Sequence, residues 1–284
     1  MLTDLHRNPA TPVARAVPPA ITDAADSIGA ATGAANVIMQ LSWPEVGWGV
    51  RESRVDSGNV YKRPLKRART TFQYLAVATL GSDDDKRAYR EEVTRIHRLV
   101  FSTPESRVKY SALDPRLQMW VAACLYVGFE DVYEWLYGPM TDSDREAFYQ
   151  SAPSLGTTLQ VRPEQWPATR EEFDDYWRDG MSRIHFDEPV RRHLVGIAEL
   201  RMLPQPTTML FGKANKWLTT GFLRSEFRDA LGLPWNPQDQ RRFEAFLAAT
   251  AAVNRLLPRV VRTITYRVLL IDLKRRLDSG RPLM

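Results

Sequence analysis

The sequence predicts an all-α fold, and three observations point to it. Apolar residues recur at helical spacing, as Tyr89, Val93 and Ile96 do, and this spacing keeps them on one helix face. Helix-starting signals such as Asp114 with its following proline precede the apolar segments. Strand-like alternation between glycine turns is scarce, and the best candidate, residues 156–161, is short. We therefore expect one domain with many helices around a single core.

The N-terminal segment, residues 1–30, is predicted to be a flexible leader with a short helix near residues 21–31. Its prolines and aspartates interrupt every apolar run, and it lacks the basic and apolar order of a signal peptide. The remaining chain, residues 31–284, is expected to form the domain. Its composition, with 44% hydrophobic residues overall, is ordinary for a globular protein with a sizeable core.

A helical hairpin is predicted next. A basic run at residues 66–71 opens an apolar stretch, and a polar loop at residues 81–85 separates it from a second helical pattern that contains His97. Thr71 and His97 are equidistant from Asp84, inside the loop. Residues equidistant from the turn of an antiparallel hairpin lie at the same height. The hairpin is therefore expected to place a hydroxyl, an arginine and an imidazole at one level of an apolar interior, where a cofactor can bind.

The rest of the chain carries further helix signals. The longest apolar run belongs to a helix that we expect to be buried and to form one wall of the cofactor pocket. Two capping boxes follow, and a proline at position 258 is expected to break the penultimate long helix. The expected helices are residues 117–137, 147–150 after Ser143 and Glu146, 173–181 after Thr169 and Glu172, 236–257, and 260–277.

Charge and cysteine content limit the classes of partner. The net charge is +5, and most of the arginines are expected to be solvated. Two clusters at helical spacing, Arg255, Arg259 and Arg262, and residues 274–276, are candidates for a basic stripe against nucleic acid or anionic lipid. No nucleic-acid-binding motif is present, so nucleic acid is not expected as a partner, whereas peripheral membrane contact is kept as an alternative. The single cysteine, Cys124, excludes an internal disulfide and fits a cytoplasmic protein.

Hydrolase, phosphate-loop and zinc-protease motifs are absent, so the histidines become the candidates for chemistry. Of the four, only His97 lies on an apolar helix face. It is either a core histidine bonded to a backbone carbonyl or a metal ligand whose cofactor supplies the other donors, as haem does. Arg67 and Arg69 either begin a solvated helix or pair with haem propionates and bound dioxygen. His185 and His193 flank a loop and are expected to face solvent or make local bonds.

The order and spacing of several motifs resemble a known family. These are Arg67-x-x-Thr70-Thr71, Tyr74-Leu-Ala-Val77 with Gly81, Val93-x-x-Ile96-His97-x-x-Val100, Tyr110-Ser-Ala-Leu-Asp114-Pro115 and Trp120-Val-Ala. The chain is similar, over roughly residues 35–277, to the catalytic domain of the rubber oxygenase (latex clearing protein) and to the ER-bound oxygenase of mycophenolic acid biosynthesis.

This resemblance implies an all-α fold that holds haem b and cleaves carbon–carbon double bonds of isoprenoid chains with dioxygen. It assigns His97 as the ligand of the haem iron, Arg67 and Thr71 as catalytic residues, and Arg67, Arg69, Thr70 and Thr71 as cofactor-binding residues. The chain departs from the family pattern at Thr70, where rubber-cleaving members have lysine, and at Ala122, where many relatives have histidine.

The leading hypothesis is therefore a haem b-dependent oxygenase that acts with dioxygen on a small, hydrophobic, unsaturated or isoprenoid-like substrate. A haem-binding or sensing protein without turnover is one alternative. A basic helical adaptor at a membrane or protein surface is the other.

Overall fold

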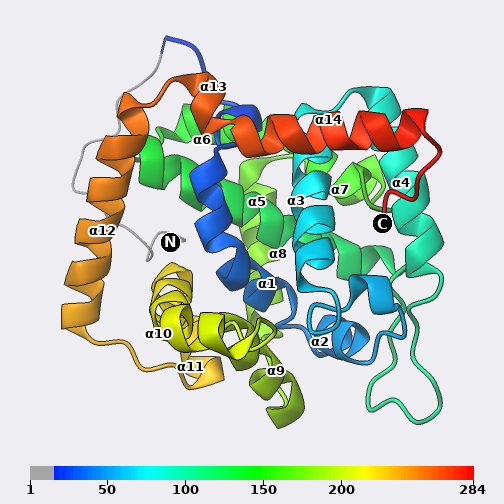
Figure 1. Ribbon diagram of the computed structural model, residues 1–284. Coiled ribbons are helices and arrows are strands. Elements are labelled where there is room, and N and C mark those ends of the chain that lie inside the picture. The colour runs from blue at the N-terminus through cyan, green and yellow to red at the C-terminus, as the bar shows by residue number, and fades with distance from the viewer. Residues whose placement is uncertain (1–15) are drawn as a thin grey trace.

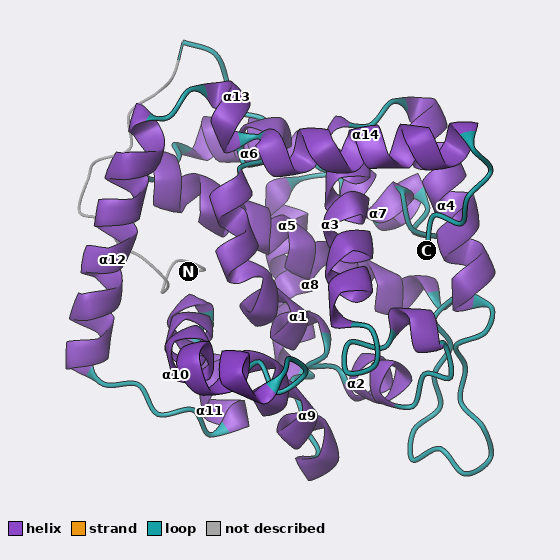
Figure 2. Cartoon of the chain, viewed as in Figure 1, coloured by secondary structure: helices purple, strands orange, loops and turns teal. Residues whose placement is uncertain are grey.

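The computed structural model describes residues 16–284, and this part of the chain consists of helices joined by loops (Figures 1 and 2). It contains no strand, only an isolated antiparallel bridge between Phe101 and Ser111. The α-helices are α1 Gly33–Gln40, α2 Pro44–Arg51, α3 Pro64–Leu80, α4 Asp83–His97, α5 Pro115–Tyr137, α6 Asp142–Gln150, α7 Ser154–Thr157, α8 Arg170–Ser182, α9 Glu188–Ala198, α10 Gln205–Phe222, α11 Ser225–Leu231, α12 Pro237–Leu256, α13 Arg259–Arg262 and α14 Ile264–Asp278. Short 3₁₀ helices are η1 Ile21–Asp23, η2 Ser27–Thr32, η3 Asp56–Gly58 and η4 Pro163–Gln165.

Helix α5 forms the centre of the core. Asp114 caps its N-terminus by accepting a hydrogen bond from the backbone of Arg116, and Pro115 occupies the first turn, where a missing N–H costs nothing. Gly138, with φ of +86°, ends the helix in a conformation that only glycine adopts easily. Most side chains of α5 are buried, and it packs against α1, α7 and α12. The expectation of a long buried helix at residues 117–137 is confirmed.

The predicted hairpin is present as α3 and α4, with a shorter turn than expected. Gly81 ends α3 because a β-carbon there would lie 2.6 Å from the carbonyl oxygen of Val77. Ser82 then caps α4 with a reciprocal hydrogen bond to Asp85, as in a capping box. The turn is therefore Gly81 and Ser82 alone, and the acidic residues expected in the loop form the first turn of α4, where they favour the helix dipole.

Other expectations are met or corrected. Thr169 and Asn236 cap α8 and α12 as predicted, and α12 ends before Pro258. The helix expected at residues 260–277 is divided into α13 and α14. Thr141, not Ser143, caps α6. The strand candidate at 156–161 was wrong: α7 and a following turn occupy it.

The N-terminal segment belongs to the core earlier than predicted. Ile21, Ala24 and Ala25 of the η1 region are almost completely buried. Asp26 accepts a hydrogen bond of 2.9 Å from the Asn254 side chain of α12. The expected boundary at residue 30 is therefore not a structural one, while residues 1–15 lie outside the described residues. Within those described, no helix combines the length and the apolar character needed to cross a membrane.

Candidate functional site

Two neighbouring cavities share lining residues of α3. The large cavity has a volume of about 390 Å³, and the smaller one, about 240 Å³, is lined by His97 and is called the histidine cavity here. Both are bordered by Arg67 and Thr71 of α3 and by Leu125 of α5. Residues of α5, the helix expected to help wall a cofactor pocket, line both cavities. The large cavity alone falls in the size range of small-molecule sites.

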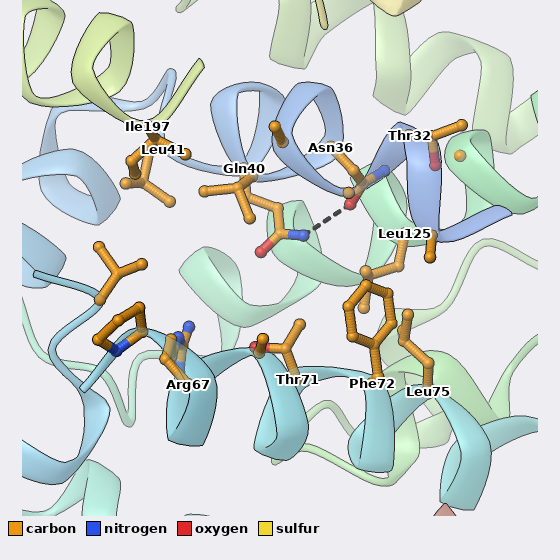
Figure 3. A pocket seen from close by; sticks show the side chains of 18 of the residues that line it. Thr32, Asn36, Gln40, Leu41, Arg67, Thr71, Phe72, Leu75, Leu125 and Ile197 are labelled. Atoms are coloured by element: carbon orange, nitrogen blue, oxygen red, sulfur yellow. Dashed lines mark hydrogen bonds between the residues drawn. The ribbon is translucent and has the colours of Figure 1, made fainter. Parts of the chain in front are cut away.

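The large cavity is mostly apolar, and α1 and α3 face each other across it (Figure 3). Asn36 and Gln40 of α1 are joined by a hydrogen bond of 2.6 Å, and the Asn36 amide also donates to the carbonyl of Cys124. Phe72 and Leu75 of α3 provide apolar surface on the other side. The polar groups of α1 are thus largely satisfied within the protein, and a ligand would meet chiefly hydrocarbon.

Arg67 is the exception. Its guanidinium forms neither a hydrogen bond nor an ion pair with any other residue that the structure describes, although much of its surface is accessible. Burial lowers the pKa of this guanidinium, and Arg67 borders both cavities. A cation in that position lacks the partners that buried charges normally have, and it is suited to a ligand oxygen or carboxylate.

The two threonines after Arg67 differ in their hydrogen bonding. Thr70 is buried, and its hydroxyl donates to the carbonyl of Arg67, one helical turn earlier. The Thr71 hydroxyl has no side-chain partner within residues 16–284, and Thr71 borders both cavities. Of the two, Thr71 is the one free to bond a ligand.

His97 is held by a hydrogen-bond network that defines its tautomer. Its Nδ1 lies 3.2 Å from Oε1 of Gln160. The amide nitrogen of Gln160 donates to the Thr94 hydroxyl, which itself donates to a main-chain carbonyl. Gln160 Oε1 therefore acts as an acceptor, which also receives a hydrogen bond from Gln118. A proton on Nδ1 of His97 satisfies this acceptor, and in that tautomer Nε2 keeps a lone pair that a metal can bind.

Electrostatics keep this imidazole neutral. Burial lowers the pKa of His97 to about 4; the hydrogen bond to Gln160 opposes that shift, and the positive charge of Arg67 adds to it. A neutral imidazole is the form that binds a metal ion. His97 is thus ready to act as a ligand over the whole physiological range of pH.

The relative heights in the hairpin differ from the prediction. Because the turn consists of Gly81 and Ser82, residues equidistant from it place His97 level with the turn that contains Arg67, and not with Thr71. The effect of Arg67 on the pKa of His97 agrees with this placement. His97 and Thr71 nevertheless line the same histidine cavity, so the structure brings together the three residues that sequence reasoning singled out.

Arg69 has a different environment. Its guanidinium is bonded to Gln73, to Asp272 of α14 and to the carbonyl of Leu283, and it borders neither cavity. Its three hydrogen bonds attach α3 to the C-terminal segment.

His185 and His193 have different surroundings. His185 is exposed and lies 3.2 Å from an Asp187 oxygen, as expected for a local bond. His193 was placed wrongly: it is partly buried, lines the large cavity, and its Nε2 has no hydrogen-bond partner. Tyr61 covers its ring at a centroid distance of 4.9 Å. The spacing of His193 to Leu194 and Ile197 on α9 was the available signal, but nothing local showed that α9 borders a cavity.

His97 is an isolated donor. No group of three or more histidine, cysteine or carboxylate side chains that would hold a metal ion occurs within residues 16–284. Cys124 is buried, and burial raises its thiol pKa well above the ordinary value. It is therefore an uncharged core residue, as expected from its apolar surroundings.

Comparison with known proteins gives relatives over most of the chain. An uncharacterized protein of Mycobacterium tuberculosis is 50% identical over 248 residues, which cover 87% of this chain and 97% of that protein. An uncharacterized protein of Mycobacterium bovis matches to the same extent. No solved structure matches the chain. Residues 23–252 match the family described as ER-bound oxygenase mpaB/B'/Rubber oxygenase, catalytic domain, and the chain therefore belongs to this family of oxygenase catalytic domains.

Proposed function

We propose that this protein is a haem b-dependent oxygenase that acts with dioxygen on an apolar, unsaturated substrate. The observation that carries the proposal is the pairing of a neutral histidine, whose Nε2 is left for a metal, with an unpartnered arginine at the junction of two cavities. Membership of an oxygenase family supports the reaction class.

The donor set fits haem. Haem iron takes as few as one protein ligand because the porphyrin supplies four nitrogens, and His97 is such an isolated donor. Hydrogen bonding of Nδ1 to Gln160 orients the ring and increases its basicity as a ligand. Apolar walls on both sides of Arg67 and Thr71 suit a flat, largely hydrophobic cofactor. When bound, haem would supply the iron that activates dioxygen.

The residues that line the cavities would then have separate roles. Arg67 would donate hydrogen bonds to a propionate or to dioxygen, and the Thr71 hydroxyl would donate beside it. The large cavity would hold the hydrocarbon chain and exclude water from the reacting atoms. Thr70 occupies the position of the family lysine, but its hydroxyl is already bonded to the backbone of Arg67. Thr70 would therefore shape the histidine cavity, and its hydroxyl would not be the donor to a ligand.

Titration of the purified protein with haem tests the proposal, with the Soret band and binding stoichiometry as readouts. We expect one haem per chain, and His97→Ala should abolish stoichiometric binding while the helical circular dichroism is retained. His185→Ala is the matched control, because its ring is exposed and lines neither cavity. Full haem occupancy and an unchanged spectrum in His97→Ala would place the ligand elsewhere.

A second comparison tests the pocket. Arg67→Ala should weaken haem retention or change the autoxidation of the ferrous–oxy form. Arg69→Ala should alter neither directly, because the Arg69 guanidinium is bonded to Asp272 of α14 and to the carbonyl of Leu283. Equal small effects of both variants would remove Arg67 from the site.

A haem-binding protein without turnover is the second candidate, and the threonine in place of the family lysine is the observation that favours it. Dioxygen consumption by the haem-loaded protein with an isoprenoid alkene such as squalene separates the two. Uptake coupled to carbonyl products supports the oxygenase, and a stable Soret band without uptake supports the binding protein.

A further inference from the structure

The outer surface of α13 and α14 exposes an unusual number of branched apolar side chains. We define the α14 outer face as Val260, Val261, Ile264, Val268 and Ile271, whose exposed fractions lie between 47% and 55%. The two helices run along one edge of the molecule, and α14 crosses over the end of α3 (Figure 1). Single exposed apolar residues are ordinary, but a contiguous row is typical of an interaction surface.

Helical geometry explains why this face is distinct. Ile264, Val268 and Ile271 follow one another at spacings of four and three residues, so they form one stripe along α14. Tyr266 and Leu273 project from the opposite side and are buried where α14 packs on α3. The helix therefore already has an inner apolar face that attaches it to the core, and the outer stripe is a second one without a partner in the described chain.

Basic side chains border this stripe. Arg267 and Lys274 lie seven residues apart on one flank, and Arg275 continues the stripe itself. All three are exposed, and none forms an ion pair within the residues that the structure describes. Asp278 is the exposed acidic residue of α14. The expected basic stripe is thus real only in part, since Arg262 and Arg276 turn inward to Asp26 and Asp272.

We propose that the α14 outer face is a docking surface for an anionic lipid membrane, on which α14 lies parallel to the surface. An amphipathic helix with branched apolar residues between arginines and lysines inserts its apolar side chains at the lipid interface, while its cations contact the headgroups. A second copy of this chain is a poorer partner, because the same face would bring the unpaired cations of two copies together. Charge complementarity therefore selects the anionic surface.

The position of α14 also connects this face to the cavities. Tyr266, on the inner side of the same helix, lines the large cavity. A membrane bound to the outer stripe would lie one helix away from the compartment that we propose for an apolar substrate. Docking itself needs neither haem nor turnover, so its test is independent of the proposed function.

Co-sedimentation of the full chain with vesicles tests docking. We compare vesicles of phosphatidylcholine mixed with phosphatidylglycerol against vesicles of phosphatidylcholine alone, at low and high salt. Binding is expected only with the anionic mixture and should weaken as salt rises. Lys274→Gln combined with Arg275→Gln should reduce partitioning roughly 30-fold, because each basic residue near an anionic surface contributes about fivefold.

The apolar contribution is tested with Val268→Ser combined with Ile271→Ser, which should also reduce partitioning. The matched control is Met209→Ser combined with Leu210→Ser on α10, where the two side chains are 81% and 71% exposed. The control should bind like the unmodified chain. Circular dichroism and size-exclusion chromatography confirm that each variant is folded.

Three outcomes would overturn the proposal. The first is no binding to the anionic vesicles at low salt, which would leave an acidic protein as the partner to consider. The second is binding that the α14 variants leave unchanged, or that the α10 variant reduces equally. The third is a stable dimer that the α14 variants convert to monomers, which would make the face an interface between copies.

Discussion

Arg170 of α8, which is buried, and Arg67 of α3, which borders two cavities, have opposite surroundings. Arg170 donates to Glu130 at 2.9 Å and to Tyr126 at 3.0 Å, and it also pairs with Asp174. Burial opposes its charge, but Glu130, Tyr126 and Asp174 together raise its pKa. Arg67 has no such partners, and burial lowers its pKa.

The contrast separates a structural cation from one that awaits a ligand. Around Arg170, the aromatic rings of Tyr126 and Phe173 pack at a centroid distance of 4.8 Å, and no space remains. Around Arg67, two cavities meet. Natural proteins pair or neutralise buried charges because an unpaired one is costly. An unpaired arginine beside a cavity is therefore expected to gain its partner when a ligand fills that cavity.

The largest expected difference is between the free energies of unfolding of the variants that lack one or the other guanidinium. Arg170→Ala should lower the free energy of unfolding by about 3–5 kcal/mol, because it breaks the buried ion pair with Glu130 and leaves that carboxylate with the Tyr126 hydroxyl and a longer contact of 3.5 Å with Arg145. Arg67→Ala in the ligand-free protein should change it by less than about 1 kcal/mol, since no side-chain hydrogen bond or ion pair within the described residues is lost. Urea denaturation of both variants measures the two values. A large loss of stability in Arg67→Ala would mean that the guanidinium has a structural role.

The pH dependence of stability sharpens the comparison at His97. The folded pKa is about 4, whereas the unfolded imidazole titrates near its ordinary value of about 6.5. Between these values the unfolded chain binds more protons, so stability falls as the pH decreases through this range. The loss from this one group should reach about 2 kcal/mol at pH 5.

Urea denaturation at pH 7 and pH 5, with His97→Gln as the matched variant, isolates that contribution. The variant should lose about 2 kcal/mol less than the unmodified chain over this interval. Identical pH dependence of the two proteins would show that the imidazole is not held neutral in the fold.

Packing density gives a third, smaller contrast, between two glycines. A β-carbon at Gly180 of α8 would lie 2.5 Å from the Trp120 ring, so Gly180→Ala should destabilise by about 1–3 kcal/mol. At Gly33, beside the large cavity, the nearest atom is the Phe72 ring at 3.5 Å, an ordinary contact. Gly33→Ala should stabilise α1 by about 0.5–1 kcal/mol. Thermal unfolding of the two variants is the measurement, and equal destabilisation would contradict the difference in packing.

Local signals allowed much of the fold to be predicted. Asp114, Thr169 and Asn236 cap helices as expected, since a cap requires only a side chain and the next two or three backbone N–H groups. Errors arose where local signals compete. Residues 156–161 alternate weakly, yet they form the end of α7 and a turn that places Gln160 against His97, and that requirement comes from tertiary packing.

The sequence allowed us to predict which residues belong to the candidate site, but not how they are arranged. The sequence by itself determined that residues 64–97 form a helical hairpin with His97 beside an apolar stripe, because helical periodicity and capping are properties of neighbouring residues. Tertiary structure decided which tautomer His97 adopts, that Arg69 binds α14 while Arg67 borders a cavity, and that His193 lines that cavity too. Each of these depends on a partner from a distant segment, such as Gln160, Asp272 or α9, and the place of that partner is set by how the helices pack around α5.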